Sequence, residues 1–160
     1  MARIGPPPPA PVLERSNVRV AALVAGFHEG LATQLLDGTR GRLTECGLPG
    51  GALAEFWVPG AFELPLACQV AAATDDYAAL IVLGVVIRGQ TPNFDYICQA
   101  AINGIASVGL AFSIPIGFGL LTVDNVAQAE ARAGGDVGNS GVDAADAAVK
   151  MLNLGGQLQR

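Results

Sequence analysis

The sequence is poor in charge, in aromatic residues and in histidine. Only 14% of its 160 residues are charged, whereas an average soluble domain has about 25%. The chain has 9 Lys and Arg residues and 14 Asp and Glu residues, which gives a net charge of −5. This negative charge argues against a nucleic-acid partner, because phosphates need a basic surface. One His and three Cys, with no Cys-x-x-Cys pair, do not make a metal site.

Residues 96–123 carry no charge, which at first suggests a membrane span. Polar side chains, Pro115 and several glycines interrupt this stretch, so we interpret it as a buried helix, a turn and a buried strand. The first 11 residues contain no apolar segment typical of a signal peptide. The sequence thus predicts a cytoplasmic protein with no membrane partner. Its cysteines, Cys46, Cys68 and Cys98, are expected to be small buried hydrophobic residues rather than disulfide partners.

Apolar residues, in contrast, make up 51% of the chain. So much apolar surface with so few charges is hard to enclose in a monomer of this size, and we expect large subunit interfaces. Prolines at 6–9 and at 11 predict an extended arm over residues 1–17, either a loose tail or a segment lying over a neighbouring subunit. Residues 18–160 are predicted to form one domain.

Apolar runs and helical periodicity alternate along this domain. Strands are predicted at 18–25, 52–58, 78–86 and 116–122, and helices at about 29–46, 62–73, 91–108, 125–132 and 141–154. In the third helix, Thr91 is expected to be the N-cap and Pro92 the first helical residue. Strands apolar on both faces alternating with helices predict an α/β fold. We expect a three-layer αβα, flavodoxin-like architecture with a four-stranded parallel sheet and helices on both faces.

Ligands of open parallel sheets bind beyond the carboxyl ends of the strands, and the residues there are candidates. Gly89, Gln90 and Thr91 open a helix and could hold an anion, although the same pattern is an ordinary helix start. Arg132 could add a guanidinium to such a site, or it could be a solvated charge at a helix end.

Other candidates also have two interpretations. Phe27 and Phe118 could each stack on a heteroaromatic ring or lie in the core. Glu63 could bind a ligand or only pair with a helix dipole. His28 is the only histidine, and a lone histidine is more often a surface or capping residue than a catalyst.

Three motifs in this order resemble the lumazine synthase family, which makes 6,7-dimethyl-8-ribityllumazine. They are VPGAFELP at 58–65, GVVIRGQTPNFDY at 84–96, and GLLT at 119–122 followed by Gln128 and by RAG at 132–134. The resemblance covers residues 18–152. It implies condensation of 5-amino-6-(D-ribitylamino)uracil with 3,4-dihydroxy-2-butanone 4-phosphate, through an imine, phosphate loss and ring closure, with no cofactor or metal.

The resemblance also implies a role for each site residue. Phe27 would stack on the pyrimidine beside His28, with Val86 and Ile87 near the ring, and Ala61, Phe62 and Glu63 would hold the ribityl chain. Gly89, Gln90, Thr91 and Arg132 would bind the phosphate, and Phe118 would close the pocket from the adjacent subunit. Family members form pentamers, in some cases twelve pentamers in a hollow shell of 60 chains, and riboflavin synthase is a further partner to consider.

Two positions depart from the family pattern. Asn93 stands where the family has the histidine expected to move protons, and an amide does not titrate near neutral pH. Ser140 lies near the position at which many members have a lysine that contacts phosphate. The leading hypothesis is a lumazine synthase, with Asn93 slowing catalysis more than binding. The alternative is a paralogue that binds a ribityl-pyrimidine or flavin, or forms a shell, with weak or altered catalysis.

Overall fold

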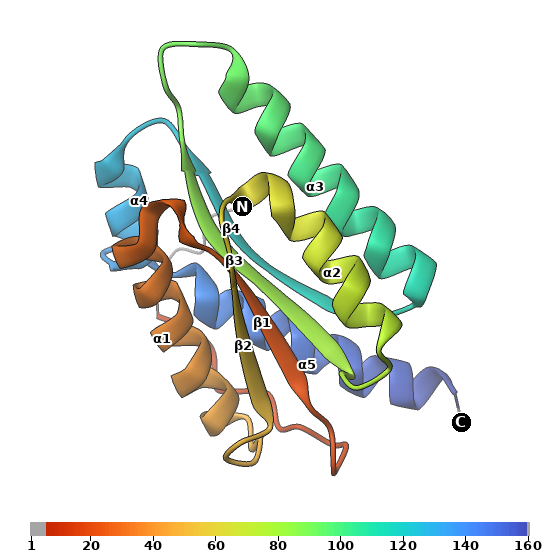
Figure 1. Cartoon of the computed structure of the whole chain (residues 1–160). Coiled ribbons are helices and arrows are strands. Elements are labelled where there is room, and N and C mark those ends of the chain that lie inside the picture. Colours follow the sequence, from red (N-terminus) through yellow and green to blue (C-terminus); the bar gives the residue numbers. More distant parts are fainter. Residues whose placement is uncertain (1–5, 160) are drawn as a thin grey trace.

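The computed structural model describes residues 6–159, in which a four-stranded parallel sheet forms the centre (Figure 1). Its strands are β1 (Val20–Ala25), β2 (Leu53–Val58), β3 (Ala79–Ile87) and β4 (Ile116–Val123), in the order β2-β1-β3-β4. From β1 the chain continues to β2 at one edge of the sheet, and from β3 it continues to β4 at the other edge. The direction of the strand order therefore reverses between β1 and β3. Their carboxyl ends are the usual place for a ligand in such a sheet.

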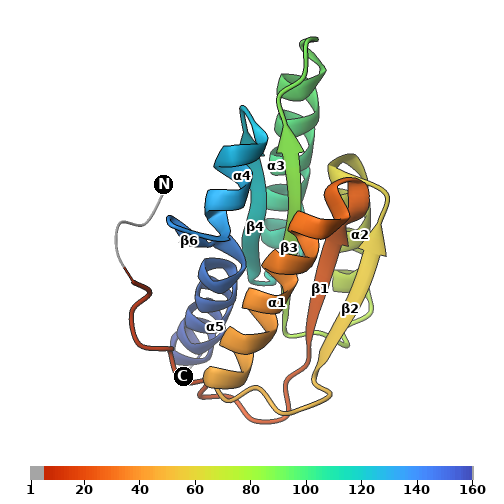
Figure 2. The ribbon, with the colours of Figure 1, turned by 90° about the vertical axis from the view of Figure 1, so that its left-hand side faces the viewer.

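Helices cover both faces of the sheet, as the sequence predicts (Figure 2). One face packs against α1 (Glu29–Glu45), α4 (Val126–Arg132) and α5 (Ser140–Leu158). The other packs against α2 (Leu64–Ala73) and α3 (Asn93–Phe112). The two faces give two separate apolar cores, so the predicted three-layer, flavodoxin-like architecture is confirmed.

The central strands are buried on both faces, but the edge strand β2 is not. All six residues of β1 are buried, and Ala79 to Val85 of β3 are buried as well. In β2, by contrast, the Phe56 and Trp57 side chains are each 46% exposed. The expectation that every strand is apolar and covered on both faces is therefore wrong for β2, whose apolar residues are partly exposed. This strand is at the edge of the sheet and has a hydrogen-bonded neighbour on one side only.

Several element boundaries differ from the predicted ones. Thr91 does not cap α3: the helix begins at Asn93, Pro92 holds the N-cap position, and no side chain caps it. The same helix continues to Phe112 rather than 108 and stops where Ser113 adopts a left-handed conformation, with φ of 50°. Helix α5 likewise runs to Leu158. A two-stranded antiparallel hairpin of β5 (Ala133–Gly135) and β6 (Gly138–Asn139) was not predicted at all.

Two glycines allow the layers to approach closely. A Cβ on Gly104 of α3 would lie 2.7 Å from the Pro65 ring, so α2 and α3 depend on its absence to pack together. A Cβ on Gly117 of β4 would collide with the carbonyl oxygen of Ala144 in α5. Glycine at 117 therefore lets α5 lie directly on β4.

The N-terminal arm lies against its own chain. Arg42 of α1 forms a two-point ion pair with Asp146 of α5, with N–O distances of 2.6 and 2.9 Å, and also donates to the carbonyl oxygen of Pro8 at 2.6 Å. Asn153 of α5 donates to the carbonyl oxygen of Val12 at 2.8 Å. The predicted extended arm is thus anchored from Pro8 onward, and its residues 1–5 lie outside the described part of the chain.

All three cysteines are free and buried, as predicted. Burial raises the pKa of the Cys68 thiol to about 12, and it also raises the pKa of Cys98. These thiols are therefore poor nucleophiles. The uncharged stretch forms most of α3 and all of β4, as interpreted from the sequence. Within residues 6–159, no helix combines the length and apolar character that crossing a bilayer requires.

Candidate functional site

A cavity of about 340 Å³ opens at the carboxyl ends of β1, β2 and β3. It brings together all the site residues predicted from the sequence except Gln90, Phe118 and Arg132. Its lining consists of Phe27, His28, Gly60, Ala61, Phe62, Glu63, Val85, Val86, Ile87, Gly89, Thr91, Asn93, Phe94 and Ile97. We call this cavity the strand-end pocket.

The first wall of the strand-end pocket is the 3₁₀ turn Gly26–His28, which follows β1 directly. Phe27 is 80% exposed, so it is not a core residue and its ring face is available to a flat ligand. The half-buried His28 meets the Phe27 ring edge-on, with the ring centroids 5.2 Å apart. The alternative that placed Phe27 in the core is therefore excluded.

The second wall is the 3₁₀ turn Ala61–Glu63 between β2 and α2. Ala61 is buried and anchors the turn, whereas Phe62 is 60% exposed at the pocket. Glu63 occupies the N-cap position of α2 without a side-chain hydrogen bond to the helix. Its carboxylate is thus close to the positive end of a helix dipole, and it also lines the pocket, where a ligand could reach it.

The third wall comes from the loop that joins β3 to α3, residues 89–92, and from Asn93, the first residue of α3. This loop projects beyond the rest of the sheet (Figure 1). Gly89, Thr91 and Asn93 are exposed and line the pocket, and α3 behind them is 20 residues long. The N-terminus of such a helix presents unpaired backbone N–H groups and a positive dipole, which together attract an anion.

Phe118 and Arg132 lie elsewhere in the same chain. Both line a different cavity of about 310 Å³ along β4, which Thr122, Ser140 and other residues complete. Arg132 is half-buried and donates to the carbonyl oxygen of Gln128, at 3.0 Å, on its own helix. The exposed Gln90 lines none of the cavities described here. Within one chain, Arg132 is therefore separate from the pocket to which the sequence assigned it, and Phe118, which was expected to act from the adjacent subunit, is separate from it as well.

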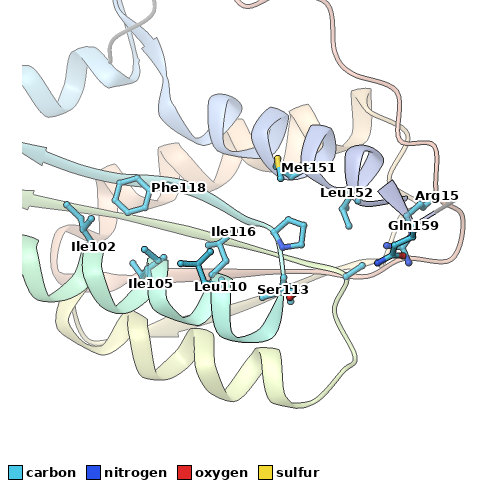
Figure 3. Close-up of a pocket in the computed structure, with 16 residues that line it drawn as sticks. Arg15, Ile102, Ile105, Leu110, Ser113, Ile116, Phe118, Met151, Leu152 and Gln159 are labelled. Atoms are coloured by element: carbon cyan, nitrogen blue, oxygen red, sulfur yellow. The ribbon is translucent and has the colours of Figure 1, made fainter. Parts of the chain in front are cut away.

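A further cavity, which the sequence did not point to, is an apolar groove of about 740 Å³ beside β4 (Figure 3). Ile102 and Leu110 line it from α3, Met151 lines it from α5, and Phe118 borders it as well. Leu110 is 84% exposed. A stripe of outward-facing apolar residues on α3 is the signal that could have located this surface, which fits the subunit interface expected from the composition.

No group of three or more His, Cys, Asp or Glu side chains that could hold a metal ion occurs among residues 6–159. The strand-end pocket itself is formed mostly by aromatic and aliphatic residues and backbone, with Glu63 and His28 as its titratable side chains. Such a pocket suits a heteroaromatic ring with a polar substituent, and the helix terminus beside it suits an anion.

Comparison with known proteins gives one consistent result. The sequence pattern of 6,7-dimethyl-8-ribityllumazine synthase matches residues 17–155. Proteins of that name from two strains of Coxiella burnetii are each 42% identical to this chain over 142 residues, which is 89% of this chain and 94% of theirs. A protein of the same name from Desulfovibrio desulfuricans is 42% identical over 146 residues, 91% of this chain and 94% of its own. The chain belongs to the 6,7-dimethyl-8-ribityllumazine synthase family.

Proposed function

We propose that the chain condenses 5-amino-6-(D-ribitylamino)uracil with 3,4-dihydroxy-2-butanone 4-phosphate in the strand-end pocket. The product is 6,7-dimethyl-8-ribityllumazine, and one inorganic phosphate and two water molecules leave. Family membership makes the chain a transferase of riboflavin biosynthesis. The observation that carries the assignment of the site is that three segments distant along the chain border one cavity: the turn with Phe27 and His28, and parts of the motifs at 58–65 and 84–96.

The aromatic amine substrate is assigned to the first and second walls. The exposed ring of Phe27 offers a stacking face for the pyrimidine, with His28 at its edge and Val86 and Ile87 closing the pocket behind. Ala61, Phe62 and Glu63 form the wall for the ribityl chain. A carboxylate acceptor and backbone N–H groups at a helix start are suitable partners for its hydroxyls.

The phosphate of the second substrate is assigned to the loop of Gly89, Gln90 and Thr91 at the start of α3. Gly89 has no side-chain or backbone atom near the position of a Cβ, so its backbone is open to a ligand. The unpaired N–H groups of α3 and the Thr91 hydroxyl supply donors. A phosphate here would lie beside the stacked amine, which is the arrangement that the condensation needs.

A second copy of the chain is proposed to complete the site with its Phe118 and Arg132. These two residues lie along β4, whose outer edge has no neighbouring strand in the described part of the chain, and the apolar groove adjoins Phe118. Covering the groove would also bury Ile102 and Leu110. We propose pentamers, alone or twelve in a hollow shell, working in the cytoplasm, where free cysteines such as these persist.

Asn93 lines the pocket, at the position where the family resemblance implies a histidine. An amide holds a ligand by hydrogen bonds but cannot accept and release a proton near pH 7. The proposed rate enhancement therefore comes mostly from holding the amine and the ketone together. The contribution of acid–base catalysis, typically about 10²- to 10⁴-fold, is reduced.

Mixing variants tests both the reaction and the sharing of the site. Phe27→Ala removes the stacking wall of one subunit, and Arg132→Ala removes the guanidinium that its neighbour supplies. Each variant alone should form product slowly, whereas a mixture that has exchanged subunits should regain activity at sites that combine two intact halves. Wild-type protein that makes no lumazine would refute the reaction. Failure of the mixture to exceed the mean of the two variants would refute the sharing.

A further inference from the structure

Arg88 follows the last residue of β3 and joins three segments at this end of the sheet. Its two terminal nitrogens donate to the two carboxylate oxygens of Asp95, in the first turn of α3, at 3.1 and 3.2 Å. Its Nε donates to Asp124, directly after β4, at 3.0 Å. The guanidinium also lies over the ring of Phe94, with 4.1 Å from Cζ to the ring centroid. These contacts fix the planar guanidinium in one orientation.

The loop that follows Arg88 has few other anchors. Gly89, Gln90 and Thr91 are exposed, and α3 begins without a side-chain cap. Backbone hydrogen bonds hold the loop at its two ends: Arg88 N–H donates to Val123, and Asp95 N–H donates to Pro92. Within residues 6–159, the side-chain hydrogen bonds that tie this loop to the rest of the fold are those of Arg88.

The Arg88 side chain takes no part in the lining of the strand-end pocket. It is not among the residues that border the cavity, whereas Phe94, the ring beneath its guanidinium, is. Hydrogen bonds from Arg88 to Asp95 and then to Asp124 raise the pKa of the guanidinium, so it stays charged at any pH of interest. Three of its five N–H donors bind the carboxylates of Asp95 and Asp124, which offset its charge and hold it beside the loop rather than in the pocket.

We propose that Arg88 is a positioning residue: by clamping Asp95, Asp124 and Phe94 it holds the loop of Gly89 to Asn93 in the geometry that binds the phosphate substrate. This inference rests on the phosphate role assigned to the loop above. Loss of the clamp should weaken capture of the phosphate substrate much more than capture of the aromatic amine, because Phe27 and the Ala61–Glu63 turn lie on other segments.

The first test compares Arg88→Met with Arg40→Met. Arg40 is a matched control because it also binds two carboxylates, Asp37 and Glu55, and its side chain is 45% exposed against 43% for Arg88. We expect Arg88→Met to raise KM for the butanone phosphate about 10- to 100-fold, the size of effect that a misplaced binding group produces. KM for the amine should change less than about twofold, and Arg88→Lys should fall between Met and wild type. Equal effects of Arg88→Met and Arg40→Met, or equal rises in both KM values, would overturn the proposal.

A second variant separates positioning from simple charge. Asp124→Asn weakens one arm of the clamp but removes a negative charge close to the phosphate loop. Positioning predicts a higher KM for the butanone phosphate, whereas an electrostatic field alone predicts a lower one. Glu55→Gln, which weakens the equivalent contact to Arg40, should leave both KM values unchanged. A lower KM for Asp124→Asn would overturn the proposal.

Amide hydrogen exchange needs no substrate and distinguishes this proposal from the proposed function. In Arg88→Met, the two hydrogen-bonded amides at the ends of the loop, those of residue 88 and Asp95, should exchange faster than in wild type, while those of β1 remain protected. Unchanged exchange in the loop would overturn the clamp even if the protein makes lumazine. Faster exchange in a protein that makes no lumazine would leave the clamp standing and refute the phosphate role of the loop.

Discussion

Replacing Phe27 by alanine should separate binding from stability. The side chain is 80% exposed, so folding buries only about a fifth of it. Full burial of such a side chain is worth about 1.5–3 kcal/mol, and a fifth of that is about 0.3–0.6 kcal/mol. The variant should therefore unfold at nearly the wild-type temperature. Stacking of an aromatic residue on a base is worth about 1–3 kcal/mol, so the dissociation constant for the ribityl-pyrimidine should rise about 5- to 150-fold.

Titration calorimetry with the pyrimidine substrate, together with thermal unfolding, measures the two quantities. Phe27→Trp should keep or improve the affinity because it retains a flat ring face. Leu158→Ala is a control of similar exposure, 77%, at the far end of α5, and it should change neither quantity. Unchanged affinity in Phe27→Ala would refute the stacking role. A large loss of stability would show that the ring is packed in the assembled protein.

Three further predictions concern single side chains. Asn93→His should raise turnover by about 10- to 10⁴-fold with little change in pyrimidine affinity, measured by steady-state kinetics, because a titrating group returns to the start of α3. Inorganic phosphate should raise the unfolding temperature of wild type but not of Arg132→Ala. An equal rise in both proteins would mean that Arg132 does not bind phosphate and is only a solvated charge at a helix end. The hydrogen bond from Arg40 holds the pKa of Glu55 below its ordinary value of 4.5, so this pair stabilises the fold above about pH 4.5 and loses its effect as pH falls through the lower folded pKa. In denaturant titrations, the free energy of unfolding of Glu55→Gln should therefore fall less steeply than that of wild type as the pH drops below 4.5.

The order of strands and helices was predictable because burial leaves a strong pattern in the sequence. All residues of β1 and, apart from Gly84, the first seven of β3 are apolar, and both strands are buried on two faces. Parallel topology then places the loops after β1, β2 and β3 at one edge of the sheet. The strand-end pocket follows from this rule, which is why most of its lining was named in advance.

The boundaries that failed depend on weaker local signals. Thr91 and Pro92 form a typical helix start, yet the chain turns at both residues and α3 begins one position later. At the other end, Ser113 rather than a glycine takes the left-handed conformation that stops the helix, so the nearest stop signal in the sequence is Pro115, two residues further on. The β5–β6 hairpin is built on Gly134 and Gly138 in left-handed conformations and contains almost no apolar pattern.

The separation of Arg132 from the pocket was not predictable from one sequence. For Phe118 the family resemblance already implied a position in the adjacent subunit's pocket, whereas it assigned Arg132 to the phosphate without naming a subunit. In the structure both residues border a cavity along β4 rather than the strand-end pocket. Their predicted roles in binding therefore depend on a neighbouring subunit.

Product formation by the unmodified protein is the most direct measurement of the central claim. Purified protein is mixed with 5-amino-6-(D-ribitylamino)uracil and 3,4-dihydroxy-2-butanone 4-phosphate, and lumazine fluorescence and inorganic phosphate are followed together. We expect both to appear at equal rates, faster than in a protein-free control, and more slowly in Phe27→Ala. A rate equal to that of the protein-free control, with the pyrimidine still bound, would contradict the assignment of this chain as a working lumazine synthase.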